Sequence, residues 1–374
     1  MKITRIEGAT LGGCRPRPVG CNARLGSHGG LISVSVVRVT TDAGPSGFGW
    51  SQCDRVRAAQ IVGRTLDDDL RVSIPKDLRI VEYPMLDLIG KVHGKSVAEL
   101  ISNGGDPKRP VKCYDTTLYF DDLHISDTTE AAEFIASEAL EGVERGHRSF
   151  KIKVGRGAMH MPVMEGVRRD IAVIQGVHSA VSGAVGPHAC IMIDANNGYN
   201  LNIAKMVLGE TSSCGVYWIE EAFHEDPRLY EELKNWMSQR DIKTFIADGE
   251  GDAAPHLLEY AKANLIDVVQ YDIHRPGFSF WCELGPSLDS WGVHSAPHHF
   301  GGYLGNFTSC HLASCIQRFA SVEWDEASVE GLESTAYVVH EGTVTVPDMP
   351  GFGIELDEKV FCEAVKKTGF TATL

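Results

Sequence analysis

The sequence of 374 residues lacks the long apolar segment that a membrane-spanning helix requires. No stretch approaches the ~18 consecutive apolar residues that crossing a bilayer takes. The first residues, MKITRIEGATL, alternate like a strand and contain no uninterrupted apolar segment of the kind found in signal peptides. We therefore expect a cytoplasmic protein that has no membrane partner.

Positive charge is also scarce. The chain has 35 lysines and arginines against 50 acidic residues, a formal net charge of −15, and no basic stripe stands out. Because nucleic acids and anionic membranes attract basic surfaces, this composition argues against both as partners. It is compatible with an anionic small molecule, since a metal ion or a local cation can reverse the field inside a cleft.

Two motifs of other protein classes are missing. The ten cysteines are scattered without a CxxC pair, so we expect reduced, structural thiols in place of disulfides or a zinc site. No glycine-rich GxGxxG follows a strand-like run, which disfavours a dinucleotide-binding, doubly wound sheet.

From residue 113 onward, short β-rich runs alternate with helical patterns. The first run is CYDTTL (113–118) and the second is SFKIKV (149–154), with a capped helical pattern between them. Six further runs follow, at residues 190–196, 215–223, 243–250, 267–272, 291–298 and 319–324. This alternation predicts an α/β fold of the closed (β/α)8 TIM-barrel type, with a doubly wound open sheet as the alternative.

The residues before this region have a different pattern. Two segments resemble antiparallel strands, KITRIEGATL and a longer run broken by a Gly-Pro-Ser-Gly turn, and helical patterns follow them. We predict an α+β capping domain at residues 1–112 and a barrel at 113–349, with a boundary near NGGDPKRPVKC (103–113). Residues 350–374 are expected to pack back on the capping domain.

Acidic residues stand at the C-terminal ends of successive predicted strands, the edge that holds the chemistry in such barrels. Asp194, Glu220 and Glu250 occupy these positions on strands three, four and five. Three converging carboxylates repel each other unless a cation lies among them, and oxygen ligands suit Mg²⁺ or Mn²⁺. We predict that these three residues bind the metal; isolated helix caps are the alternative.

Two lysines lie on the second strand. Lys151 and Lys153 alternate with apolar residues in SFKIKV, so both side chains point to one face. A cation and a second lysine nearby lower the pKa of a lysine, which makes it a usable base near neutral pH. Two lysines at an exposed strand edge are the alternative.

The last strands end in an acid–histidine pair and a further acid. Asp272 ends strand six, and His298 and His299 end strand seven, so Asp272 could accept a hydrogen bond from the ring of His298. His299 is the competing candidate for this role. Glu323 ends strand eight, where a carboxylic acid could donate a hydrogen bond to a developing oxyanion.

These motifs together resemble a known family. KIK, DAN, IEEA, DGE, DIHRPG, APHH and VEW, with the closing PGFGIELDE, are similar in kind and order to the enolase superfamily, in its mandelate racemase branch. The resemblance covers nearly the whole chain. It implies that Lys153 is a base on one face of the substrate and that Lys151 neutralises a carboxylate oxygen and lowers the pKa of Lys153.

The resemblance implies roles for the other motif residues as well. Asp194, Glu220 and Glu250 match the Mg²⁺ ligands of the family, and Asn196 of the DAN motif matches a substrate-binding position. His298 with Asp272 matches the dyad on the opposite face, and Glu323 matches the acid that binds the substrate carboxylate.

The implied chemistry begins with removal of the proton α to a carboxylate, helped by Mg²⁺, Lys151 and Glu323. Loss of a β-hydroxyl, assisted by protonated His298, would then give a 2-keto-3-deoxy acid. We expect a dehydratase (a hydro-lyase) of an aldonate or aldarate. The alternatives are a racemase or epimerase of a 2-hydroxy acid, a cycloisomerase, and a metal-binding barrel without catalysis.

Substrate choice is expected to rest with the capping domain. The glycine-rich segment GCRPRPVGCNARLGSHGG (13–30) is predicted to be a mobile loop that brings Arg24 and His28 to the substrate, with Trp50 as a second wall. An ordinary solvated turn is the alternative. The sequence does not select the acid, and it does not select between the homodimer and homo-octamer that the resemblance implies.

Overall fold

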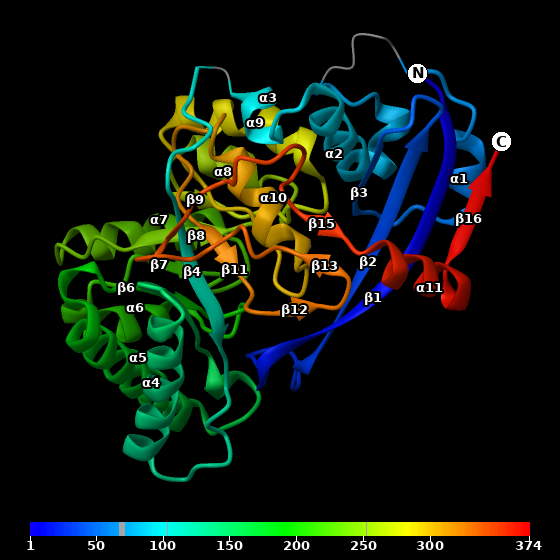
Figure 1. Ribbon diagram of the computed structural model, residues 1–374. Helices are drawn as coiled ribbons and strands as arrows, with labels where there is room; N and C mark the ends of the chain where they lie inside the picture. Colours follow the sequence, from blue (N-terminus) through cyan, green and yellow to red (C-terminus); the bar gives the residue numbers. More distant parts are fainter. Residues whose placement is uncertain (67–71, 103, 252) are drawn as a thin grey trace.

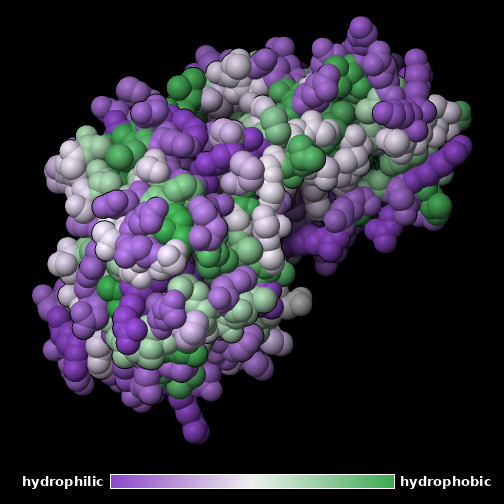
Figure 2. Space-filling view, turned by 90° about the horizontal axis from the view of Figure 1, so that it is seen from below, coloured by the Kyte–Doolittle hydropathy of each residue, from purple (hydrophilic) through white to green (hydrophobic). Residues whose placement is uncertain are grey.

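The computed structural model describes residues 1–66, 72–102, 104–251 and 253–374, so Asn103 of the predicted boundary segment lies outside the described residues. A strand-centred barrel with helices around it adjoins an N-terminal region built on long strands (Figure 1). Hydrophobic and hydrophilic side chains intermingle on the face shown in Figure 2. Within the described ranges, none of the helices combines the length and apolar character that crossing a bilayer requires.

Parallel strands form the barrel, in the order β10-β9-β8-β7-β6-β5-β4-β11. The edge strands meet where Ser295 accepts a backbone hydrogen bond from Ala320 at 2.8 Å and donates one to Arg318 at 3.0 Å. The predicted barrel is thereby confirmed. Its strands are β4 (Val111–Leu118), β5 (Ser149–Lys153), β6 (Cys190–Asp194), β7 (Trp218–Glu220), β8 (Phe245–Asp248), β9 (Val268–Val269), β10 (His294–Ser295) and β11 (Val322–Trp324).

Helices surround these strands (Figure 1). Local sequence explains where several begin: Asp127 and Asp226 accept backbone N–H groups of the following first turns, and Pro227 occupies a first helical position that needs no N–H donor. The helices are α4 (Thr128–Glu144), α5 (Val163–Val185), α6 (Leu201–Glu210), α7 (Pro227–Ser238), α8 (Leu257–Lys262), α9 (Phe278–Trp291) and α10 (Leu304–Leu312).

The alternation changes after the eighth strand. The short strands β12 (Ser328–Val329), β13 (Leu332–Glu333), β14 (Thr343–Val344) and β15 (Glu355–Leu356) follow β11 before the next helix begins. The proline- and glycine-rich segment VPDMPGFG lies in this stretch, and both residue types disfavour a helix interior.

The N-terminal region is an antiparallel sheet with helices beside it. Its strands are β1 (Ile3–Val19), β2 (Gly29–Thr41) and β3 (Ser46–Trp50), and its helices are α1 (Arg55–Ile61), α2 (Glu82–His93) and α3 (Val97–Ile101). After α11 (Glu358–Thr368), β16 (Phe370–Thr373) returns and pairs with β1, so both termini lie at one end of this sheet (Figure 1). The division of the chain at residues 112 and 113 stays a prediction.

The predicted mobile loop at residues 13–30 is wrong in its first part. Strand β1 continues to Val19, which pairs with Gly29, and a register shift lies between Cys14 and Val19. Pro16 and Pro18 stand in this stretch, and since proline has no N–H to donate, the ladder is interrupted there without ending the strand. Only the short connection between β1 and β2 turns.

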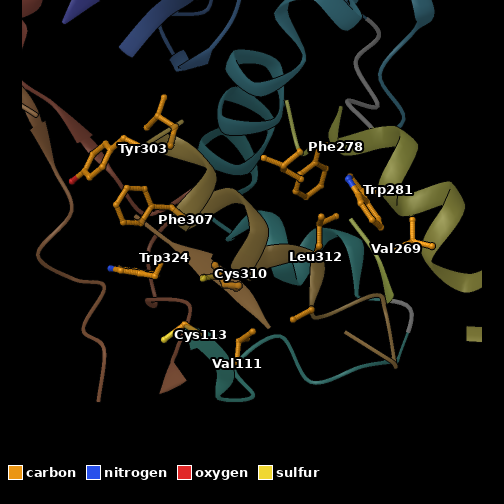
Figure 3. Close-up of a cluster of buried hydrophobic side chains, with 14 of the residues drawn as sticks. Val111, Cys113, Val269, Phe278, Trp281, Tyr303, Phe307, Cys310, Leu312 and Trp324 are labelled. Carbon is orange, nitrogen blue, oxygen red and sulfur yellow. The ribbon is translucent and has the colours of Figure 1, made fainter. Parts of the chain in front are cut away.

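A buried apolar cluster fixes the last helices against the barrel. In Figure 3, Phe307 of α10 lies beside Trp324 of β11, and Cys310 of α10 lies between Trp324 and the side chains of α9. Phe307 and Trp281 are each 1% exposed or less. Burying an aromatic side chain of this size contributes about 1.5–3 kcal/mol, so the cluster holds the end of β11, where Glu323 stands, in a defined position.

Candidate active site

Three carboxylates meet at the C-terminal ends of adjacent strands. Asp194 ends β6, Glu220 ends β7 and Glu250 follows β8, and one oxygen of each lies within 4.8 Å of the others. The parallel register places Asp194 beside Glu220. Asp248 is the other acid at the end of β8, but its carboxylate faces away and accepts a hydrogen bond from Tyr230 at 2.6 Å.

The surroundings of this triad fit a divalent cation. Burial raises the pKa of Glu220 to about 8; Asp194 and Glu250 add to this shift, and Lys151 opposes it. The Asn196 Oδ1 atom is buried and has no hydrogen-bond donor among the described residues. Uncompensated oxygens of this kind are the ligands that Mg²⁺ and Mn²⁺ take.

Both lysines of β5 point into the barrel, which excludes the exposed strand edge. Lys151 is 1% exposed and Lys153 is 3% exposed. Lys151 Nζ lies 2.7 Å from Glu220 Oε1, 3.1 Å from Glu323 Oε1 and 3.6 Å from Asp194 Oδ2. Lys153 Nζ contacts Asp194 Oδ2. Each ammonium group is therefore held by carboxylates.

The expected lowering of the lysine pKa does not hold for the chain by itself. Burial disfavours the ammonium form of Lys153, but Asp194, Tyr119 and Glu250 together outweigh burial and raise the pKa of Lys153 well above its usual range. Glu220, Glu323 and Asp194 likewise raise the pKa of Lys151. The sequence argument assumed a cation among the acids, and without one the carboxylates dominate.

The structure pairs Asp272 with His298. His298 Nδ1 lies 3.1 Å from Asp272 Oδ2, and the other Asp272 oxygen accepts the backbone N–H of His274 at 2.7 Å. Burial opposes a charged His298 ring, yet Glu250, Glu323 and Asp272 raise its pKa to about 10. The competing His299 is buried, and Asp272 pairs with His298 in its place. The backbone N–H of His299 donates to Glu323 at 2.7 Å.

Glu323 is a carboxylate in this arrangement, contrary to the expected carboxylic acid. Burial favours its neutral form, but Lys151 and His298 hold the pKa of Glu323 well below its usual value. Backbone N–H groups of His299 and Phe300 and the Thr116 hydroxyl, at 2.7–3.1 Å, satisfy its oxygens.

Sequence reasoning missed several residues that hold these acids. Gln270 and Trp218 donate to Glu220 Oε2 at 2.8 and 3.1 Å. Trp218 precedes Glu220 by two positions, and this period-two spacing was the available signal.

Asn196 and Glu221 have φ of 42° and 41°, a left-handed conformation that asparagine tolerates better than most residues.

A cavity of about 420 Å³ lies over the site. Lys153, Glu250 and His298 line its barrel side, and Arg15 and His28 line its capping side. Of the predicted substrate-binding residues, the structure therefore brings His28 to this cavity, as it does Asn196.

Two other predicted substrate-binding residues lie apart from the described lining of the cavity. Arg24 is exposed on the turn between β1 and β2. Trp50 stacks on His274, with ring centroids 4.5 Å apart, so it lies against the segment that follows Asp272. Trp50, the last residue of β3, therefore supports the segment that follows Asp272 and does not belong to the described lining of the cavity.

Comparison with known proteins agrees with this architecture. The family model described as "Enolase C-terminal domain-like" matches residues 135–360. A galacturonate dehydratase from a Geobacillus species, in complex with D-galacturonate and 5-keto-4-deoxy-D-galacturonate, is 44% identical, with a TM-score of 0.94 over 99% of this chain and 98% of that chain.

Two further relatives are similar to this chain. A mandelate racemase/muconate lactonizing protein from Geobacillus, in complex with magnesium and tartrate, is 43% identical, with a TM-score of 0.95 over 100% of this chain and 97% of that chain. The D-galactarolactone cycloisomerase of Agrobacterium fabrum is 27% identical over 76% of this chain and 72% of its own length. The chain therefore belongs to the enolase superfamily, in the branch of mandelate racemase.

Proposed function

We propose that this protein is a Mg²⁺-dependent dehydratase that converts a sugar acid to a 2-keto-3-deoxy acid. One geometric observation carries the proposal: Lys153 of β5 and His298 after β10 face the same cavity beside the carboxylate triad. The strands β4 and β11 separate β5 from β10 in the barrel, so the two groups approach a bound substrate from different sides. The related galacturonate dehydratase supports the same type of reaction.

Asp194, Glu220 and Glu250 would hold the magnesium ion. When bound, Mg²⁺ supplies positive charge that offsets these acids, stabilises the negative charge developing on the substrate carboxylate and favours loss of a proton from nearby lysines. The related structure in complex with magnesium supports this choice of metal.

The residues of the chain then divide the proton transfers. Lys151 keeps its proton and compensates the charge of the substrate carboxylate, next to Glu323. Neutral Lys153 accepts the proton from the α-carbon, and the electrons of that C–H bond move toward the substrate carboxylate; they then form the double bond to the β-carbon as the β-hydroxyl leaves. His298 donates its Nε2 proton to the departing β-hydroxyl, which leaves as water, and the remaining enol becomes the keto acid.

The Asp272–His298 pair favours dehydration over the alternatives. Asp272 orients the imidazole and keeps a proton available on it, as departure of a poor leaving group requires. A racemase or epimerase is the second candidate, because Lys153 and His298 flank the cavity from two sides and either could return a proton.

A hexuronate such as D-galacturonate is the first substrate to test. Its carboxylate is C6, so the α- and β-carbons are C5 and C4, and dehydration gives the 5-keto-4-deoxy acid. This product, the one named in the related complex, has the same arrangement as a 2-keto-3-deoxy acid counted from the carboxylate. The homo-oligomeric state stays a prediction.

The test is a Mg²⁺-dependent screen of hexuronates, aldonates and aldarates in deuterated buffer. Semicarbazide detects the keto acid, and NMR detects deuterium at the α-carbon. A keto acid that disappears with EDTA or with Lys153→Met supports the proposal. Deuterium exchange without a keto acid would favour the racemase or epimerase, and neither signal with any acid would contradict both.

A further inference from the structure

We infer that the capping side of the cavity selects sugar acids with a single carboxylate and rejects the corresponding diacids. The inference rests on the proposed function and narrows it, because aldonates and uronates have an uncharged far end and aldarates do not. The selecting element is the ion pair of Arg15 with Asp325, whose guanidinium is already neutralised before a substrate binds.

The Arg15–Asp325 pair is complete within the chain. Arg15 Nε and Nη2 each donate to one oxygen of Asp325 at 2.7 Å, and the two side chains are 3% and 0% exposed. Asp325 Oδ2 also accepts the backbone N–H of Gly301 at 3.0 Å, and the guanidinium carbon lies 4.5 Å from the centre of the Phe300 ring. Because breaking this bidentate pair would leave Asp325 buried and unpaired, the charge of Arg15 stays compensated by Asp325 when a ligand enters the cavity.

The other polar group on this side is an uncharged histidine. Burial, Lys153 and Arg15 lower the pKa of His28, so its ring is neutral at pH 7. The ring packs edge-on against Tyr119 and Phe300, with centroids 5.0 and 5.4 Å apart. Its Nε2 atom is buried and has no hydrogen-bond partner in the described part of the chain, so it can serve a hydroxyl or carbonyl oxygen of the substrate.

The remaining arginines of this strand and turn are directed elsewhere. Arg17 lies 2.9 Å from Glu138 and donates to the Thr117 carbonyl, on the outer side of the barrel. Arg24 is exposed and does not belong to the described lining. A second carboxylate reaching the capping side would thus lose its hydration and gain no free cation there, which is costly.

The related complex with tartrate is consistent with this geometry. Tartrate has four carbons, two fewer than a hexuronate or a hexarate. Its two carboxylates are therefore closer together than those of a six-carbon diacid, so tartrate does not test the selection proposed for the longer diacids.

The test compares D-galacturonate with galactarate, which differ only in having an aldehyde or a carboxylate at C1. The wild-type enzyme with Mg²⁺ should favour galacturonate in kcat/KM by about 100-fold or more. If galacturonate is not turned over, the same comparison uses whichever monoacid is, with its oxidised diacid. Turnover of the diacid within tenfold of the monoacid would overturn the inference and leave the dehydratase intact.

The variant Asp325→Asn separates charge from shape. Asparagine keeps the volume and can still accept the Gly301 N–H, but it frees the charge of Arg15, so relative activity on galactarate should rise about tenfold or more. The matched double variant Arg15→Met/Asp325→Asn removes both charges and should show no such rise. An equal rise in both variants would refute the role of Arg15.

Binding provides a readout that does not depend on turnover or on either variant folding. Calorimetry with the Lys153→Met protein and Mg²⁺ measures the affinity for each acid without reaction. Tighter binding of galacturonate is expected; equal or tighter binding of galactarate would overturn the inference. If galacturonate binds more tightly but the wild type dehydrates no sugar acid, the proposed function fails and the selectivity of the cavity stands.

Discussion

Two networks of buried charge lie in the same barrel and differ in their balance. In the first, Arg156 bridges Asp122 and Asp170 at 2.7 and 2.8 Å, and Arg169 adds a second contact to Asp122 at 3.1 Å. Two cations thus meet two carboxylates. In the second, two lysines face a larger group of carboxylates, namely Asp194, Glu220, Glu250 and Glu323.

The charge balance of a buried network distinguishes a structural role from a functional one. The arginine network is neutral in sum and each of its ions has a partner, so it is complete without any ligand. In the lysine network the carboxylates outnumber the lysines, and burial, together with Asp194 and Glu250, raises the pKa of Glu220 to about 8. A cation from outside the chain would relieve this imbalance, and this feature marks the second network as a candidate metal site.

The largest expected effect comes from the lysine network. Replacing Lys153 with Met should lower kcat by about 10³–10⁴-fold, because the base is removed while the shape of the side chain is largely kept. In saturating Mg²⁺, which would compensate the charge of Asp194 in place of the lost ammonium group, the melting temperature should change little. Steady-state kinetics with Mg²⁺ and calorimetric melting measure the two quantities, and residual activity above one tenth would remove Lys153 from the chemistry.

In the arginine network, a substitution is expected to lower stability and to leave activity nearly unchanged. Arg156→Met should lower the free energy of unfolding by about 3–5 kcal/mol, because Asp122 and Asp170 lose their buried partner. Urea unfolding measures the loss, and kcat per folded molecule should stay within a few-fold of the wild type.

Arg145→Met is the matched control for Arg156→Met. It breaks a more exposed helical ion pair with Glu141 and should cost about 0.5 kcal/mol or less. Equal losses in the two variants would mean that burial of the arginine network contributes nothing.

Removing one acid from the lysine network should have a smaller effect of opposite sign on stability. Glu220→Gln relieves repulsion among the carboxylates, and its amide oxygen can still accept a hydrogen bond from Lys151. Gln270 can turn its own amide oxygen toward the new NH2 group. Without metal, the variant should be about 1 kcal/mol more stable than the wild type, while calorimetry shows weakened Mg²⁺ binding. A clear loss of stability without metal would argue that the acids are already balanced.

The smallest effect concerns a third, balanced pair. His147 Nε2 lies 2.8 Å from Glu326, and although burial opposes its charge, Cys113, Glu326 and Asp115 raise the pKa of His147 to about 10. A raised pKa stabilises the folded protein fully below the unfolded value of about 6.5, and this contribution is lost as pH rises through 10.

Stability of the wild type relative to His147→Gln should therefore fall by about 1–2 kcal/mol between pH 6 and pH 10. Urea unfolding of both proteins at the two values measures the change. A difference that grows with pH would show that His147 is neutral in the folded protein.

Parts of the site could be predicted from the sequence because they depend on local spacing. Lys151 and Lys153 share a face through the period of a strand, and Asp194 and Glu220 end strands that are neighbours in both sequence and space. Once a barrel is expected, the C-terminal ends of its strands are expected to meet at one face, so residues at those ends can be assigned to the site.

Other parts depend on contacts between distant segments and could not be predicted. The sequence places Arg15 in a predicted mobile loop and gives no sign of its partner Asp325, which follows 310 residues later. Trp50 was expected to contact substrate, but its position against His274 depends on how β3 packs beside the end of β9. The pKa of Lys153 depends on its burial and on Asp194, Lys151 and Glu250. These residues stand in different parts of the chain, so no single motif contains the cause.

The return of β16 to β1 has a consequence for how the protein is made. Arg5 pairs with Thr373 and Gly8 with Phe370, so residues 362 to 368 positions apart share one ladder. At synthesis rates of roughly 5–20 residues per second, the nascent β1 waits about 20 to 70 s for this partner. During that time one edge of β1 is open to pairing with other chains, and the barrel emerging from the ribosome in between must hold the first strands in place until the sheet is complete.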